Sequence, residues 1–126
     1  MQKIVLISGL WNLILGLGSL GSGLLKSDIN STDRYFSCMV GVLLLFTSAV
    51  LIVASRDLQK YATFVLWEGL LRFAAAGILL TIGLSAIGNN AVFLGMTDTV
   101  WGITYAIGLP YVVKKSVKQI LFDQSV

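Results

Sequence analysis

The sequence predicts an all-α membrane protein, a transmembrane bundle of four helices with both termini in the cytoplasm. Of its 126 residues, 56% are apolar and 12% are charged, and the mean hydropathy is +0.88. Soluble domains average about 45–50% apolar and about 25% charged residues. The apolar residues fall in four long runs, and a helix needs about 20 mostly apolar residues to cross a bilayer. Composition and pattern together exclude a disordered chain, a nucleic-acid-binding domain and an ordinary soluble enzyme.

The four apolar runs define the predicted spans, and short polar segments separate them. We expect a single transmembrane domain, residues 1–126, with spans at 4–25, 36–54, 61–87 and 92–113 and a cytoplasmic tail at 114–126. The first run is longer than the roughly 7–15 residues of a signal-peptide core, so it is predicted to be a retained span.

Basic residues distinguish the two sides of the predicted bundle. Six of them lie in the segments that four spans place on one side, namely Lys3, Arg56, Lys60, Lys114, Lys115 and Lys118. The opposite loops contain only Lys26 and Arg34. Because short cytoplasmic segments carry an excess of Lys and Arg, we expect both termini in the cytoplasm. The net charge of +3 follows from this topology and does not indicate a nucleic-acid partner.

The tail places Val117, Ile120, Leu121 and Phe122 among lysines. This pattern suits a short helix lying on an anionic inner leaflet. A frayed continuation of the fourth span is an equally open interpretation.

The residue types that most catalytic and metal chemistry needs are missing from the sequence. It contains no histidine and one cysteine, Cys38. Ligation of metal or haem by histidine and Ser-His or Cys-His catalysis are therefore excluded. Gly16, Gly18 and Gly21 fit a dinucleotide-binding pattern, but they lie inside an apolar span with no preceding strand. We therefore expect a non-enzymatic protein without a cofactor or metal ion.

Small residues recur at helical spacing in every span. Lipid tails give helices no hydrophobic drive to associate, so close packing through small residues matters more in a membrane. The candidates are Gly9, Gly16 and Gly23 in the first span, Gly41 in the second, Gly77 in the third, and Gly102 and Ala106 in the fourth. They can pack within the bundle or face another protein. Pro110 lacks a backbone N–H and clashes with the carbonyl four residues earlier, so a kink is expected there.

A polar network is predicted inside the membrane from Asn12, Glu68, Arg72 and Asp98. Glu68 and Arg72 are four residues apart, so on a helix they share one face and can pair. Counted from Lys60 at about 1.5 Å per residue, Glu68 lies about 12 Å deep and Arg72 about 18 Å. An unpaired charge at the bilayer centre costs at least about 2.5–3.5 kcal/mol, so Arg72 needs a partner. Asp98 in the fourth span can share it with Glu68.

The role of this network is open at the level of sequence. The Glu68–Arg72 pair can be structural, fixing how the helices pack. A carboxylate that gains and loses a proton at this depth is instead what proton-coupled transport requires. Residues 97–99 can alternatively cap the N-terminus of a shorter fourth helix, which would place Asp98 near the outer surface. Asn12 is expected to donate a hydrogen bond between helices.

A shift of 56 residues lays the first span on the third and the second span on the fourth. Trp11 then coincides with Trp67, and Gly21 with Gly77. These matches allow two copies of a helical hairpin in the same orientation, as in parallel repeats. The alternative is that unrelated membrane hairpins of this length look alike.

Three short segments resemble small uncharacterised four-span bacterial inner-membrane proteins: 10–16 (LWNLILG), 54–58 (ASRDL) and 66–72 (LWEGLLR). The resemblance implies a four-span fold in a bacterial membrane, and it implies no activity. The chain also has the length of small multidrug resistance transporters. That family's carboxylate lies in the first span, however, where this chain has Asn12 and no acid.

The sequence therefore predicts a small integral membrane protein whose partners are the lipid bilayer and other membrane subunits or further copies of itself. The first hypothesis is an accessory or assembly subunit of a larger membrane complex, without catalytic activity of its own. The alternative is a small oligomeric proton- or ion-coupled transporter or channel that uses Glu68, Arg72 and Asp98. A third option is a quinone- or lipid-binding membrane protein, for which Trp67 and Tyr105 supply aromatic surface.

Overall fold

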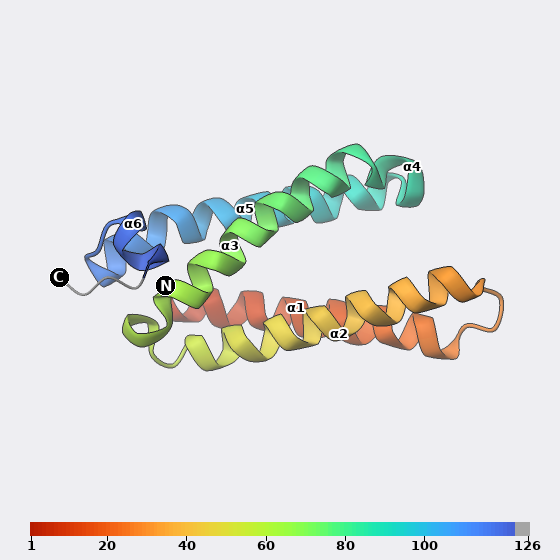
Figure 1. Ribbon diagram of the computed structural model, residues 1–126, viewed down its shortest axis with the longest axis horizontal. Coiled ribbons are helices and arrows are strands. Elements are labelled where there is room, and N and C mark those ends of the chain that lie inside the picture. Colours follow the sequence, from red (N-terminus) through yellow and green to blue (C-terminus); the bar gives the residue numbers. More distant parts are fainter. Residues whose placement is uncertain (123–126) are drawn as a thin grey trace. The chain divides into compact units, whose positions relative to one another are not determined.

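The computed structural model of the protein describes residues 1–122 (Figure 1). Its helices are α1 (Gln2–Leu25), α2 (Ser31–Ala54), α3 (Leu58–Thr81), α4 (Gly83–Ile87), α5 (Asn89–Val113) and α6 (Val117–Leu121). The described residues form no strand, so the all-α fold class is confirmed. In this part of the chain α1, α2, α3 and α5 are long and apolar enough to cross a membrane, with 24 or 25 residues each. Such helices are about 36 Å long, against a hydrocarbon core of about 30 Å.

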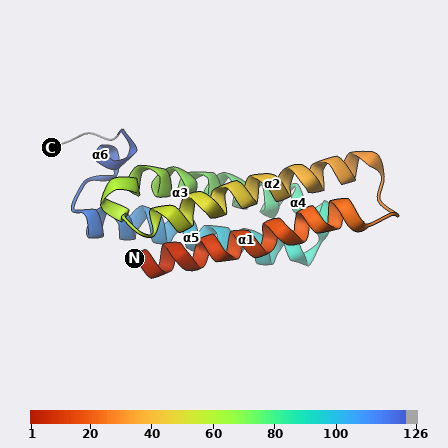
Figure 2. The ribbon, with the colours of Figure 1, turned by 90° about the horizontal axis from the view of Figure 1, so that it is seen from below.

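Over the described residues the chain forms two compact units, and each contains an antiparallel pair of long helices. The N-terminal unit (Gln2–Asp57) contains α1 and α2. The C-terminal unit (Leu58–Val126 together with Met1) contains α3, α4, α5 and α6. Figures 1 and 2 show α1 beside α2, and α3 beside α5. A single domain over 1–126 is expected from the sequence, whereas the described residues form these two units.

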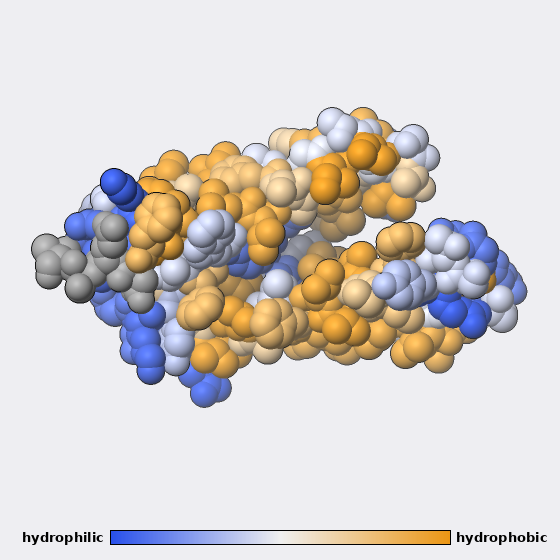
Figure 3. Space-filling view, viewed as in Figure 1, coloured by the Kyte–Doolittle hydropathy of each residue, from blue (hydrophilic) through white to orange (hydrophobic). Residues whose placement is uncertain are grey.

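Apolar side chains cover the flanks of the long helices, and hydrophilic side chains gather at helix ends (Figure 3). Every long helix exposes large apolar residues near its middle, such as Ile14 at 64%, Phe46 at 67%, Leu71 at 62% and Val100 at 59%. Contiguous apolar surface of this kind is unusual on a soluble monomer. Together with four helices long enough to cross a bilayer, this surface indicates a multi-pass membrane protein.

The second span begins five residues before its predicted start at 36, because α2 is capped by polar residues. Asn30 has an extended backbone, and its side chain accepts a hydrogen bond of 2.8 Å from the backbone N–H of Asp33. Its amide also donates to Oδ2 of Asp33 at 2.7 Å. A capping side chain satisfies a donor that the first turn leaves unpaired, and an acid there complements the helix dipole. The polar segment predicted as a loop therefore starts the helix.

The third span was predicted as one run over 61–87, and this boundary is wrong at both ends. Helix α3 starts at Leu58, within the expected turn, and ends at Thr81. The rest of the apolar run forms the short helix α4, which ends at Gly88 with a φ of 59°. A positive φ suits glycine, so the chain reverses there, and α5 begins at Asn89 rather than at 92. Hydropathy alone does not detect a turn made of apolar residues.

The tail forms a separate short helix. Lys114 adopts a left-handed conformation with φ 54° and ψ 37°, which ends α5. Ser116 and Gln119 then form a reciprocal capping box at the start of α6. The short-helix interpretation is confirmed, and the frayed continuation of the fourth span is wrong. Contact of this helix with lipid stays a prediction, and residues 123–126 of the predicted tail lie outside the described residues.

Candidate functional site

The two long helices of the N-terminal unit meet through glycines. A Cβ added at Gly9 would lie 3.1 Å from Leu51, and one at Gly16 would lie 3.0 Å from the backbone nitrogen of Leu45. A Cβ at Gly23 would lie 3.1 Å from the backbone of Cys38. The three glycines are spaced by seven residues and all face α2. The prediction that they pack helices is confirmed, and the contact is within the chain.

Of these glycines, Gly41 of α2 lies closest to the backbone of the facing helix. A Cβ there would lie 2.7 Å from the backbone nitrogen of Leu20 and 2.9 Å from its Cα. Distances below 3.0 Å are not found for real Cβ atoms, and backbone atoms of a helix cannot rotate away. Gly41 is therefore the position where α1 and α2 most depend on the absence of a side chain.

The C-terminal unit uses a different pattern, in which a large side chain lies opposite each of three glycines, Gly69, Gly95 and Gly102. The ring of Phe73 covers Gly102, where a Cβ would lie 2.9 Å from the ring, and Leu80 covers Gly95. The packing role predicted for Gly102 is confirmed. Gly69 was not predicted as a packing residue, but the completely buried Tyr105 packs against it from α5.

Three predicted packing or bending positions have other outcomes. Gly77 faces open space, with nothing within 4 Å of an added Cβ, so it is not a packing contact within the described chain. Ala106 is half-buried on α5. Pro110 lies inside α5, which continues to Val113, and the kink at Pro110 stays a prediction.

The predicted polar residues occur in both units. In the N-terminal unit, Asn12 is 3% exposed and donates a hydrogen bond of 3.0 Å from Nδ2 to Oγ1 of Thr47 on α2. Thr47 in turn donates to the carbonyl of Leu44 at 3.1 Å. The prediction that Asn12 donates between helices is confirmed, and Thr47, its acceptor, was not predicted.

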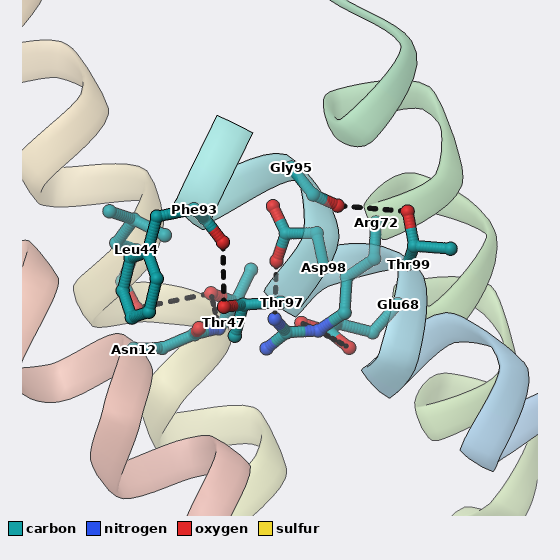
Figure 4. A network of polar contacts seen from close by, with 10 residues as sticks. All are labelled: Asn12, Leu44, Thr47, Glu68, Arg72, Phe93, Gly95, Thr97, Asp98 and Thr99. Atoms are coloured by element: carbon teal, nitrogen blue, oxygen red, sulfur yellow. Dashed lines mark hydrogen bonds and ion pairs between the residues drawn. The ribbon is translucent and has the colours of Figure 1, made fainter. Parts of the chain in front are cut away.

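In the C-terminal unit, Arg72 is bonded to two carboxylates at once (Figure 4). Its Nε lies 2.9 Å from each carboxylate oxygen of Glu68, one turn earlier on α3. Its Nη1 lies 2.7 Å from Oδ1 of Asp98 on α5. The side chains of Arg72 and Glu68 are 5% and 9% exposed, whereas that of Asp98 is 21% exposed. The structure thus brings together Glu68, Arg72 and Asp98, which we call the charged triad.

Helix geometry explains why Asp98 can reach Arg72. Arg72 lies nine residues before the end of α3 at Thr81, and Asp98 lies nine residues after the start of α5 at Asn89. Both are therefore about 14 Å below the turn that joins the antiparallel helices. The alternative that residues 97–99 cap a shorter helix is wrong, because Thr97 and Thr99 bond the carbonyls of Phe93 and Gly95 inside α5.

The charged triad combines two carboxylates with one guanidinium, so it carries a charge of −1 when all three groups are ionised. Buried charges are tolerated when they are paired and hydrogen-bonded. The arrangement can fix α3 against α5, and its excess carboxylate can take up a proton or a cation. Among the described residues no group of three or more His, Cys, Asp or Glu could hold a metal ion.

Comparison of the chain with protein-family models, with curated proteins and with solved structures gives no match. A function must therefore be argued from the charged triad and the helix surfaces.

Proposed function

We propose that the chain is a small integral protein of a bacterial-type inner membrane and acts as a non-catalytic accessory or assembly subunit of a larger membrane complex. The observation that carries this proposal is the bonding of the charged triad. Arg72 donates to both Glu68 and Asp98, and two of the three side chains are less than a tenth exposed. A group held in this way serves to fix one helix against another.

Helix faces left open within the units supply the surface for such a partner. Gly18 and Gly21 on α1 and Gly77 on α3 have nothing within 4 Å of an added Cβ. Small residues let the backbones of membrane helices approach closely, and the other glycines of α1 already serve that purpose against α2. The open glycines can serve it against another subunit.

The proposed topology places both termini in the cytoplasm, because six basic residues flank the spans on that side and two on the other. The resemblance to small four-span bacterial membrane proteins agrees with this location. The proposed topology is supported by the basic residues in the short segments beside the spans.

Native mass spectrometry tests the accessory role. We expect the chain, extracted from its source membrane in mild detergent, to co-migrate with other polypeptides at fixed stoichiometry. A green fluorescent protein fused to the C-terminus should fluoresce if that end is cytoplasmic. A clean homo-oligomer without other polypeptides would contradict the accessory role, and a dark fusion at normal protein levels would contradict the topology.

A second function is favoured by the charge balance of the triad. Two carboxylates face one guanidinium, and Asp98 is the more exposed of them. A small oligomeric proton- or ion-coupled transporter could load and unload the excess carboxylate. In liposomes, Asp98→Asn should then abolish proton-coupled flux without reducing insertion. Flux that is equal for the variant and the parent chain would remove Asp98 from any such role.

A further inference from the structure

The C-terminal unit has four of its five Lys and Arg side chains at one end. Lys60 lies near the start of α3, and Lys114, Lys115 and Lys118 follow the end of α5. Because α3 and α5 are antiparallel, these four residues share one end of the unit, and we call them the lysine cluster. From 73 to 97, which includes the opposite end, the sequence contains no charged residue.

Helix α6 is fixed beside this cluster by two side chains of α3. The last carbonyls of a helix have no partner within it. Thr63 donates from Oγ1 to the carbonyl of Ile120 at 2.8 Å, and Trp67 donates from Nε1 to the carbonyl of Leu121 at 3.3 Å. Thr63 and Trp67 are four residues apart, so they lie on one face of α3 and meet two consecutive carbonyls. This pair of bonds holds the tail against the unit.

Burial shows that α6 has one face on the protein and one face free. Ile120 is 2% exposed, whereas Val117 and Phe122 are 43% and 64% exposed. Lys114 and Lys118 are also exposed. Tyr111, 86% exposed, and Trp67, 50% exposed, add amphipathic rings at the same end. Exposed lysines beside apolar and aromatic side chains match the boundary between headgroups and acyl chains.

We propose that the lysine cluster, with α6 held by Thr63 and Trp67, forms a binding site for the headgroup of an anionic phospholipid. Lysine binds a phosphate as a compact point charge, and clustered lysines next to a span attract anionic lipids. The bonded helix keeps Lys114, Lys115 and Lys118 beside Lys60 rather than on a loose tail. This inference is independent of the function proposed above.

The experiment uses the full chain in nanodiscs of phosphatidylcholine with or without phosphatidylglycerol, followed by native mass spectrometry of retained lipid. The parent chain should retain phosphatidylglycerol in preference to phosphatidylcholine. A triple variant, Lys114→Asn, Lys115→Gln and Lys118→Gln, should lose retention by about a hundredfold, from about 1 kcal/mol per lysine. Asparagine is chosen at 114 because it tolerates the left-handed backbone.

A second variant separates a built site from bulk positive charge. Thr63→Val with Trp67→Phe keeps every lysine but removes both donors to α6, and retention should fall by about tenfold as the three lysines lose their fixed positions. Removing three charges elsewhere, with Lys3→Gln, Lys26→Gln and Arg56→Gln, should change retention little. Circular dichroism checks that each variant stays helical.

Three results would overturn the proposal. Retention by the triple variant equal to that of the parent would exclude the lysine cluster. Undiminished retention in the Thr63 and Trp67 variant would show that charge alone attracts the lipid. Complete displacement of the lipid by free inorganic phosphate would identify the site as a phosphate site rather than a lipid site.

Discussion

Replacing Arg72 with glutamine should destabilise the C-terminal unit by about 3–5 kcal/mol, because it removes the guanidinium that both carboxylates bond. Glu68 and Asp98 both bond the guanidinium, at 2.9 Å and 2.7 Å. Without it, both carboxylates lose this bonded cation, and a charge inside a membrane helix is costly when it loses a charged partner. No other single substitution in the triad takes the guanidinium away from both carboxylates.

Matched substitutions at the carboxylates should be far milder. Glu68→Gln leaves the pair of Arg72 and Asp98, and Asp98→Asn leaves the pair of Arg72 and Glu68. Each variant therefore has one positive and one negative charge, and we expect losses below about 1.5 kcal/mol, the net range of a typical hydrogen bond. The double variant Glu68→Gln and Arg72→Gln removes one negative and one positive charge, but it should still destabilise the unit, because Asp98 loses the guanidinium that it bonds. Adding Asp98→Asn should restore most of the stability.

These differences can be measured by titrating the full chain in mixed micelles with sodium dodecyl sulfate and following helix content. The expected order of stability has the parent, Glu68→Gln and Asp98→Asn close together and Arg72→Gln far below them. If Arg72→Gln unfolds at the same detergent fraction as Glu68→Gln, the guanidinium does not hold the two helices together.

The two bonds of the triad differ in how far apart their residues lie in the sequence, and this decides which of them could be predicted. The Glu68–Arg72 pair is fixed by a spacing of four on one helix, so the sequence alone indicates it. The bond from Arg72 to Asp98 depends on where the chain turns between α3 and α5. That turn, at Gly88, falls in the short segment that the predicted spans leave between residues 87 and 92. The sequence left two places for Asp98, beside Arg72 or in a cap near the outer surface, and the structure decides for the bond to Arg72.

The two hairpins show both the strength and the limit of the predicted repeat. Helices α1 and α3 have 24 residues each and start at Gln2 and Leu58, which is the predicted shift of 56. Under that shift Asn12 corresponds to Glu68. In one unit this position makes a neutral hydrogen bond to Thr47, and in the other it makes an ion pair with Arg72. The apolar pattern is enough to give a membrane helix in both halves. The residue that bonds the side chain at this position differs, because it belongs to side chains that the two halves do not share.

Glycine packing was predicted best where its spacing is regular, and less well where a bulky partner is needed. Gly9, Gly16 and Gly23 are spaced by seven residues, so helix geometry places them on one face. Their role in helix packing could therefore be predicted from the sequence. Gly69 has no glycine at a regular spacing beside it, and its importance appears only once Tyr105 is seen against it. Gly77 shows the converse, because a small residue in a span need not contact anything in the same chain.

Replacing Gly41 with alanine should separate α1 from α2 and cost the N-terminal unit about 1–3 kcal/mol, the usual range for overpacking. The added Cβ would lie 2.7 Å from a backbone nitrogen and 2.9 Å from the Cα of Leu20, and neither atom can move without the helix. Small residues are what lets membrane helices approach this closely, and lipid offers no hydrophobic force to close the gap again.

Labelling of Cys38 can test this prediction, and Gly18→Ala is the matched control variant. Cys38, the one cysteine in the sequence, is half-buried and lies close to Gly23 at the contact of α1 with α2. Its labelling by maleimide during detergent titration should therefore begin earlier in Gly41→Ala than in the parent. Gly18→Ala makes the same chemical change where nothing lies within 4 Å, so its labelling curve should match that of the parent. Equal curves for the two variants would mean that α1 and α2 tolerate a side chain at Gly41, and that the close approach does not hold this hairpin together.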